Sequence, residues 1–412
     1  MTAHAAAAAV LRSLDFLANQ SHEHADRMRD YMLGVRLIGR GFADAAVTSR
    51  AAAFGGDLVA RWSEALDADA VNGSTSDELR LRFGDLLNAE RLGASPPPAY
   101  RAALLRRVRE VGFSGFFSFD ARTQPPLVAA RHANRWDAWQ HALIFGWVCE
   151  RTAGAECGAS YFDVLKWLPW LKLEAPLMAQ PPAGTHAPAD EWRLYAAQLS
   201  AVTHVVYTLG DYDQRRLDPT LLPAEFAFLQ RALPAALELR MPEAVGEVAD
   251  CLKAFGLAEA SYAPLQAAAT FLVGAQNPDG SWGWPVERRL GSIYHTTIVS
   301  AWGLRDGAAA PPWAAPPPPP LAFAELEPVL RLWARWHEAP PPPEEWAGAT
   351  AAAYARGDAA SALPPPRDEA AAPSMEERMR RAMEADPKMA DAMRRAQARA
   401  RGGPPRPVKE EL

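Results

Sequence analysis

Polar residues at helical spacing form a first candidate site in the segment THVVYTLGDY. Tyr207 and Asp211 follow His204 by three and seven residues, so a helix would place the three side chains on one face. The intervening residues are mostly apolar, and polar groups on such a helix need partners because an unpaired buried polar group is costly. We therefore take His204, Tyr207 and Asp211 as candidate catalytic residues.

Two later segments supply further candidate ligands and acid–base groups. Glu247 and Asp250 lie three residues apart in PEAVGEVADCLKAFG, and His295 follows Tyr294 in IYHTTIVSAWG. Together with His204 these segments offer two imidazoles and a carboxylate, a common ligand set for catalytic zinc that leaves one position open. We predict His204, Asp250 and His295 as zinc ligands, with Glu247 as the alternative carboxylate and Tyr294 as a further catalytic residue.

Two other interpretations of these side chains stay open. The same groups can form a metal-free acid–base site, with Tyr, His and carboxylates moving protons. They can also be structural, with the two histidines bonded to carboxylates and Asp250 paired with Lys253 or an arginine. The sequence contains no GxGxxG, P-loop, CxxC pair or HExxH, so we predict no nucleotide cofactor.

The elements that must position these residues are predicted to be helices. Hydrophobic residues make up 49% of the chain, their spacing is helical throughout, and no alternation typical of strands is found. Short connections indicate antiparallel hairpins, which stack into a solenoid or close into an α/α toroid whose inner helices line a central cavity. The predicted helices are 5–20, 24–40, 42–66, 76–90, 98–111, 135–152, 160–172, 190–210, 223–238, 242–255, 261–275 and 293–304.

One segment indicates a particular helical fold more specifically than the helical periodicity does. TFLVGAQNPDGSWGWP has an aromatic and an aliphatic residue, then Gln, Gly and Trp at fixed spacing, with turn chemistry between the Gln and the Trp. It resembles the QW motif of squalene and oxidosqualene cyclases at every position, namely Phe271, Leu272, Gln276, Gly280 and Trp282. The continuation YHTT, ending at Gly303-Leu304, resembles the helix of protein prenyltransferase β subunits that holds a zinc-binding histidine.

The resemblance implies an α/α toroid and an enzyme that acts on a small apolar or isoprenoid-type substrate in its central cavity. It covers about 40 of the 412 residues. The chain has no DxDD acid (Asp67-Ala-Asp69-Ala comes nearest) and no DDxxD run, and Asp250 and Cys251 are adjacent rather than two apart. Two alternatives remain: a toroid polysaccharide lyase or sugar epimerase that uses Tyr and His, and a non-catalytic helical scaffold.

The composition changes after the predicted toroid domain, which we place at residues 1–307. Residues 308–373 are rich in proline and are predicted to be an extended linker with a short helix at 323–338. Residues 374–412 form a tail rich in Met and Arg. The tail is interpreted either as a solvated segment or as a docking element for a protein partner or an anionic membrane surface.

Charge, hydropathy and cysteine content narrow the function classes. The formal net charge of −6 argues against a nucleic-acid-binding protein, and no run approaches the ~20 apolar residues of a transmembrane helix. The three cysteines predict no disulfide framework. The N-terminal stretch is predicted to be an amphipathic helix rather than a signal peptide. We therefore predict a cytoplasmic protein, with an organelle transit peptide as the alternative.

Overall fold

The computed structural model describes residues 3–24, 27–123, 135–168, 190–284 and 292–306. The predicted linker, its helix at 323–338 and the tail at 374–412 lie outside these ranges. The chain divides into two compact units, one of Met1–Leu173 with Ala197–Pro366 and one of Glu174–Ala196 with Arg367–Leu412. The first unit holds nearly all of the described residues, and the fold and the sites below belong to it.

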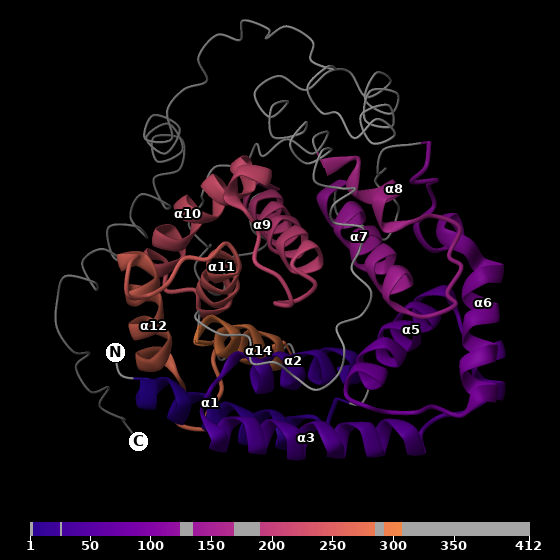
Figure 1. The fold of residues 1–412 in the computed structure, drawn as a ribbon, viewed down its shortest axis with the longest axis horizontal. Coiled ribbons are helices and arrows are strands. Elements are labelled where there is room, and N and C mark those ends of the chain that lie inside the picture. Colours follow the sequence, from indigo (N-terminus) through magenta and orange to yellow (C-terminus); the bar gives the residue numbers. More distant parts are fainter. Residues whose placement is uncertain (1–2, 25–26, 124–134, 169–189, 285–291, 307–412) are drawn as a thin grey trace, which may run out of the picture. The chain divides into compact units, whose positions relative to one another are not determined.

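Every regular element among the described residues is a helix, so the prediction of an all-α protein is confirmed (Figure 1). The helices are α1 (Ala3–Gln20), α2 (Met28–Gly41), α3 (Ala45–Glu64), α4 (Ala68–Asn72), α5 (Ser76–Arg91), α6 (Pro98–Phe117), α7 (Arg135–Arg151), α8 (Tyr161–Leu165), α9 (Asp190–Leu209), α10 (Pro223–Glu238), α11 (Pro242–Ala254), α12 (Ala263–Ala275) and α14 (Ile293–Gly303), with a short 3-10 helix at Pro219–Leu221.

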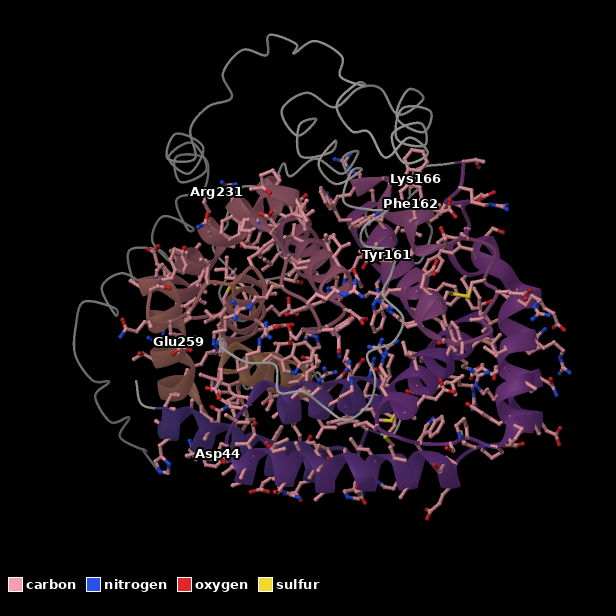
Figure 2. All side chains as sticks on the ribbon, in the orientation of Figure 1. Asp44, Tyr161, Phe162, Lys166, Arg231 and Glu259 are labelled. Atoms are coloured by element: carbon pink, nitrogen blue, oxygen red, sulfur yellow. A yellow bond between two sulfur atoms is a disulfide. The ribbon has the colours of Figure 1, made fainter. Side chains whose placement is uncertain are left out.

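Most predicted boundaries agree with these helices to within a few residues. The exceptions have local causes. The short α4 was not predicted; it starts where Asp67 accepts a hydrogen bond from the amide of Asp69. The helix α6 continues six residues beyond the predicted end, past a kink at Gly112 with φ of 64°. The helix predicted at 160–172 is shorter, since α8 ends at Leu165, and residues 169–172 lie outside the described ranges. Capping residues define several other starts, as at α3, where the side chain of Asp44 (labelled in Figure 2) accepts hydrogen bonds from two amides.

Helices that are distant in the sequence contact one another within the first unit. α2 packs against α3 and α5, α5 against α6 and α7, and α11 against α10, α12 and α14. α14 also packs against α2, and α1 packs against α12 and α14, so the first helices of the chain contact the last described ones. None of the described helices combines the length and apolarity that crossing a bilayer requires.

The turn between α12 and α14 holds three helices together. The amide nitrogen of Gln276 donates to the carbonyls of Ala9 in α1 (2.7 Å) and of Gly280 (3.0 Å), and its oxygen accepts from Arg12. The fully buried Trp282 donates from Nε1 to the carbonyl of Leu272 in α12. Gly280 has φ of 89°, and a Cβ there would meet the carbonyl oxygen of Arg12 at 2.3 Å, so only glycine fits.

Two glycines let α11 and α14 approach each other closely. A Cβ on Gly246 would lie 2.4 Å from the carbonyl oxygen of Val299, and one on Gly303 would lie 2.7 Å from the Cα of Gly246. Real Cβ contacts are never that short, so the backbones touch where side chains would otherwise separate them. This contact determines which side chains of the two helices face each other.

The cysteine prediction is wrong for two of the three residues. Cys149 at the end of α7 and Cys157 before α8 form a disulfide, drawn in yellow in Figure 2, that closes a loop with a sequence separation of 8. The spacing of these two cysteines is not a CxxC motif, so it did not indicate a disulfide. The turn after α7 reverses the chain and brings Cys157 next to Cys149 at the end of the helix. Cys251 is a buried free thiol.

Candidate functional site

Three side chains that can bind a metal converge where α11 faces α14. Glu243 and Glu247 are four residues apart on α11 and therefore share one face of the helix. His295 lies in the first turn of α14. One ligand atom from each of the three lies within 4.8 Å of the other two, and no other such group occurs among the described residues. We call Glu243, Glu247 and His295 the acidic cluster.

A hydrogen-bonded ion pair fixes one edge of this cluster. His295 Nδ1 donates to Oε1 of Glu243 at 2.9 Å. Burial lowers the pKa of His295, but the hydrogen bond and the charge of Glu243 outweigh burial and raise that pKa to about 9. Burial raises the pKa of Glu243, yet His295 brings it below its usual value. Both side chains are partly open to solvent, with 39% and 46% exposure, so the pair lies at an accessible surface.

Glu247 lies deeper and is held in a different state. Only 7% of this residue is exposed. Burial, followed by the negative charge of Glu243, raises its pKa to about 7, although His295 and a hydrogen bond from Thr203 oppose the increase. Thr203 Oγ1 donates to Oε2 of Glu247 at 3.2 Å. A carboxyl whose pKa is close to neutrality can take up or release a proton, and it can also lose its proton to a cation.

A second pair of side chains on the neighbouring helices borders the cluster. The hydroxyl of Tyr294 donates to Oδ2 of Asp30 in α2 at 2.9 Å, and Arg29 forms an ion pair with Asp30. Burial raises the pKa of Asp30, but the charges of Arg29 and His295 lower it overall. Asp30 therefore stays ionised and adds negative charge near His295.

The predicted ligands are only partly brought together. His295 and the alternative ligand Glu247 are in the acidic cluster, whereas His204 and Asp250 are not among the grouped ligands. His204 Nδ1 donates to the carbonyl of Ser200 in its own helix at 2.7 Å. Burial lowers the pKa of His204 to about 4, so its imidazole is neutral at neutral pH. Asp250 lies further along α11, where Arg305 forms an ion pair with it.

The other predicted catalytic residues also have separate positions. Tyr207 donates from its hydroxyl to the backbone carbonyl of Glu247 at 3.4 Å, and its ring stands edge-on to that of His204. Asp211 does not share a helix face with His204, because α9 ends at Leu209 and Asp211 has a φ of 51°. Its carboxylate accepts from Trp147 and pairs with Arg91 and Arg151.

Sequence reasoning missed Glu243 and Asp30. Glu243 follows the proline that begins α11, where an acidic residue is ordinarily explained by the helix dipole. The available signal was the four-residue spacing of two glutamates with a glycine between them, since a glycine inside a helix indicates close approach of another backbone. Nothing in the local sequence connects Asp30 with a helix that begins more than 260 residues later.

Comparison of the chain with protein-family profiles, with curated proteins and with solved structures finds no match.

Proposed function

We propose that this chain is an enzyme with an α/α-toroid fold that binds a divalent metal ion, zinc being the first candidate, at Glu243, Glu247 and His295. The convergence of these three ligand atoms within 4.8 Å carries the proposal. Two carboxylate oxygens and one imidazole nitrogen are donors that zinc accepts, and three protein ligands leave a fourth position open. A metal bound there would supply a Lewis acid and a water molecule of lowered pKa.

The contacts of the first unit support the proposed toroid. α2, α5 and α7 contact one another in order, and α11 contacts α14, which returns to α2. α9 lies between these two groups, because Thr203 bonds Glu247 in α11 and His204 lies 3.3 Å from the amide of Gln140 in α7. In the proposed ring these six are the inner helices, and α3, α6, α10 and α12 cover them from outside. The QW-like turn, which ties α12 to α1 and α14, fits the proposed relation to terpene cyclases and prenyltransferases.

A small apolar or isoprenoid-type substrate is the proposed ligand. Aromatic rings from the proposed inner helices gather beside the acidic cluster. The rings of Tyr31 and Tyr294 are 5.2 Å apart, and the ring of Tyr207 is 5.7 Å from that of Trp302. These rings make the region apolar, which fits an apolar ligand better than a charged one.

A metal-free acid–base enzyme, such as a lyase or epimerase, is the second candidate. The protonation states favour it: His295 is held as a cation by Glu243, while Glu247 has a pKa of about 7. Such a pair provides one group that stabilises negative charge and one that transfers a proton near neutral pH. Zinc binding distinguishes the two candidates, because this second one requires none.

The test is titration of zinc into the chelator-stripped full chain by isothermal calorimetry. We expect one site, with affinity reduced at least 10-fold in His295→Ala and in Glu247→Gln, since each variant removes a ligand. Zinc affinity should rise with pH because His295 must lose its proton to bind. His22→Ala, which removes a histidine from the segment after α1, is the matched control and should bind as the wild type does. Equal affinity in His295→Ala, or no binding at all, would exclude the metal site.

A further inference from the structure

A second cluster of charges lies beyond the opposite ends of the helices that carry the acidic cluster. Arg36 and Arg40 are in the last turns of α2, Arg91 and Arg151 are the last residues of α5 and α7, and Arg305 follows α14. Three carboxylates from Asp211, Asp213 and Asp250 face them. Cations at helix C-termini offset the helix dipoles, so the first question is whether the carboxylates balance these arginines.

The carboxylates are already committed to three of the five arginines. Asp211 pairs with Arg91 at 3.3 Å and with Arg151 at 3.0 Å. Arg305 pairs with Asp213 at 2.8 Å and also with Asp250. These contacts are nearly completely buried, so the partners are not exchanged readily with water.

Neither Arg36 nor Arg40 forms a direct ion pair in the described part of the chain, although the charges of Asp211 and Asp213 act on both. Arg36 is 6% exposed, and its Nε and Nη2 atoms are buried and have no hydrogen-bond partner. Arg40 donates from Nη2 to the neutral amide oxygen of Gln214 at 2.8 Å. Burial, and then the positive charges of Arg91 and Arg40, lower the pKa of Arg36, although Asp211 and Asp213 oppose this decrease. Positive charge in this region is therefore not fully compensated.

A cavity of about 100 Å³ lies next to these arginines. Its charged and polar lining consists of five cations, two carboxylates and one amide: Arg40, Arg215, Arg216, Lys253, Arg305, Asp213, Asp306 and Gln214. Lys253 is bound to Glu259 and to two backbone carbonyls. This volume is well below the roughly 300–1,000 Å³ of pockets that hold drug-sized ligands, so the cavity suits a small ion rather than a large ligand.

The turn that carries Asp213, one of the two acidic residues of the cavity, is held in an uncommon backbone conformation. Asp211, Tyr212 and Asp213 have φ values of 51°, 49° and 69°, all in the left-handed region. Three consecutive residues other than glycine rarely adopt this conformation, and such strain persists where the surroundings enforce it, frequently at ligand sites. Here the turn places Asp211 and Asp213 in ion pairs with Arg91, Arg151 and Arg305.

We propose that this cavity is a binding site for a phosphate group, held by Arg40. Arg36 lies one turn earlier on α2 and adds positive charge outside the lining. The lining carries five cationic side chains and two carboxylates, a positive excess that a dianion offsets, and the fork of an arginine binds phosphate oxygens in pairs. The site is distinct from the acidic cluster, because Arg305 follows His295 by ten residues, a rise of about 15 Å along a helix. The inference does not depend on the proposed metal enzyme.

Calorimetric titration of inorganic phosphate into the full chain at constant ionic strength tests this site. We expect one phosphate per chain, with at least a 10-fold loss of affinity in Arg40→Gln. Arg109→Gln, which removes a 56% exposed arginine on α6, is the matched control and should leave the affinity unchanged. No phosphate binding, or equal binding by Arg40→Gln, overturns the proposal.

A second measurement uses only the wild type and remains decisive if Arg40→Gln does not fold. Hydrogen exchange followed by mass spectrometry should show that phosphate slows exchange of the amides in the 210–216 segment. Slowed exchange elsewhere with none in this segment overturns the proposal. Titration of glycerol 3-phosphate then distinguishes the sources of the phosphate group: tighter binding than inorganic phosphate indicates a phosphorylated metabolite, and weaker binding indicates the free anion.

Discussion

Oε1 of Glu243 lies 2.9 Å from Nδ1 of His295, across the close contact of α11 and α14. This bond commits one imidazole nitrogen to a carboxylate and leaves only Nε2 for a ligand or a proton. Glu247 lies one turn further along α11, and its pKa is lowered by the charge of His295 and raised by that of Glu243. The protonation state of the whole cluster therefore depends on contacts between two helices that begin about 50 residues apart in the sequence.

Glu247 should make the metal-free protein lose stability as the pH rises from 5 to 7. Its pKa in the folded state, about 7, is above its ordinary value of 4.5. The folded state therefore binds the proton more tightly, and this stabilisation is present below pH 4.5 and is lost as the pH rises through 7. Glu247→Gln imitates the protonated form, so unfolding free energies measured in urea at pH 5 and 7 should differ less in the variant, by about 1–3 kcal/mol.

Only the difference between the two pH slopes matters in that experiment. His204 is present in both proteins, so its contribution cancels when the slopes are subtracted. The pKa values of His295 and Glu247 depend on each other, so the difference in slope reports the two groups together. Parallel curves for the wild type and Glu247→Gln would mean that the carboxyl has an ordinary pKa in the folded protein.

Replacing Gly246 with alanine should destabilise the protein and weaken zinc binding together. The new Cβ would lie 2.4 Å from the carbonyl oxygen of Val299, so α11 and α14 must move apart. Such overpacking costs about 1–3 kcal/mol, and the movement separates both glutamates from His295. Gly56→Ala in α3 is the control, because nothing lies within 4 Å of its new Cβ; it should be neutral or slightly stabilising. Zinc affinity unchanged in Gly246→Ala would show that the contact does not position the cluster.

Gln276→Ala should lower the unfolding free energy by about 1–3 kcal/mol, since the amide links α1 to the turn after α12 through three partners. The measurement is chemical unfolding followed by circular dichroism. Gln266→Ala, on the exposed face of α12, should change stability by no more than about 0.5 kcal/mol. Equal effects of the two substitutions would show that the amide contributes nothing beyond an ordinary surface side chain.

Removal of the Cys149–Cys157 disulfide should destabilise the fold modestly. The closed loop is short, with a sequence separation of 8, for which chain entropy gives about 2–3 kcal/mol. A reducing agent should lower the melting temperature of the wild type and leave that of the Cys149→Ser, Cys157→Ser double variant unchanged. If the reducing agent lowered the melting temperatures of the wild type and the double variant equally, its effect would not come from this disulfide.

The helices were predictable because their signals are local. Proline at the first position of α6, α10 and α11, the capping pair Thr75 and Glu78 at α5, and the Asn-Pro-Asp-Gly turn after α12 all mark boundaries that can be recognised in the sequence. Helical spacing then supplied the apolar faces. The end of α9 shows the limit, since Asp211 continues the spacing of His204 but lies in a left-handed turn.

The acidic cluster was harder to predict, because contacts between helices determine which side chains lie close together. Asp250 and Glu247 are one turn apart on α11, yet they have different partners. Asp250 forms an ion pair with Arg305, whereas the charge of His295 acts on the pKa of Glu247. Spacing within one helix cannot distinguish these partners. The decisive constraint is the touching of Gly246 and Gly303, and it depends on how two helices cross rather than on either sequence alone.

The hydrogen bonds between Gln276 and α1 can form only after nearly all of the described chain has been synthesised. Arg12 and Gln276 are separated by 264 residues, so a ribosome working at about 5–20 residues per second needs roughly 13–53 s to make the second after the first. During that interval the apolar side of α1 has no permanent partner from α12 or α14. The first helix can pack against α3 soon after it emerges, but its contacts with α12 and α14 form only after the last helices have been made.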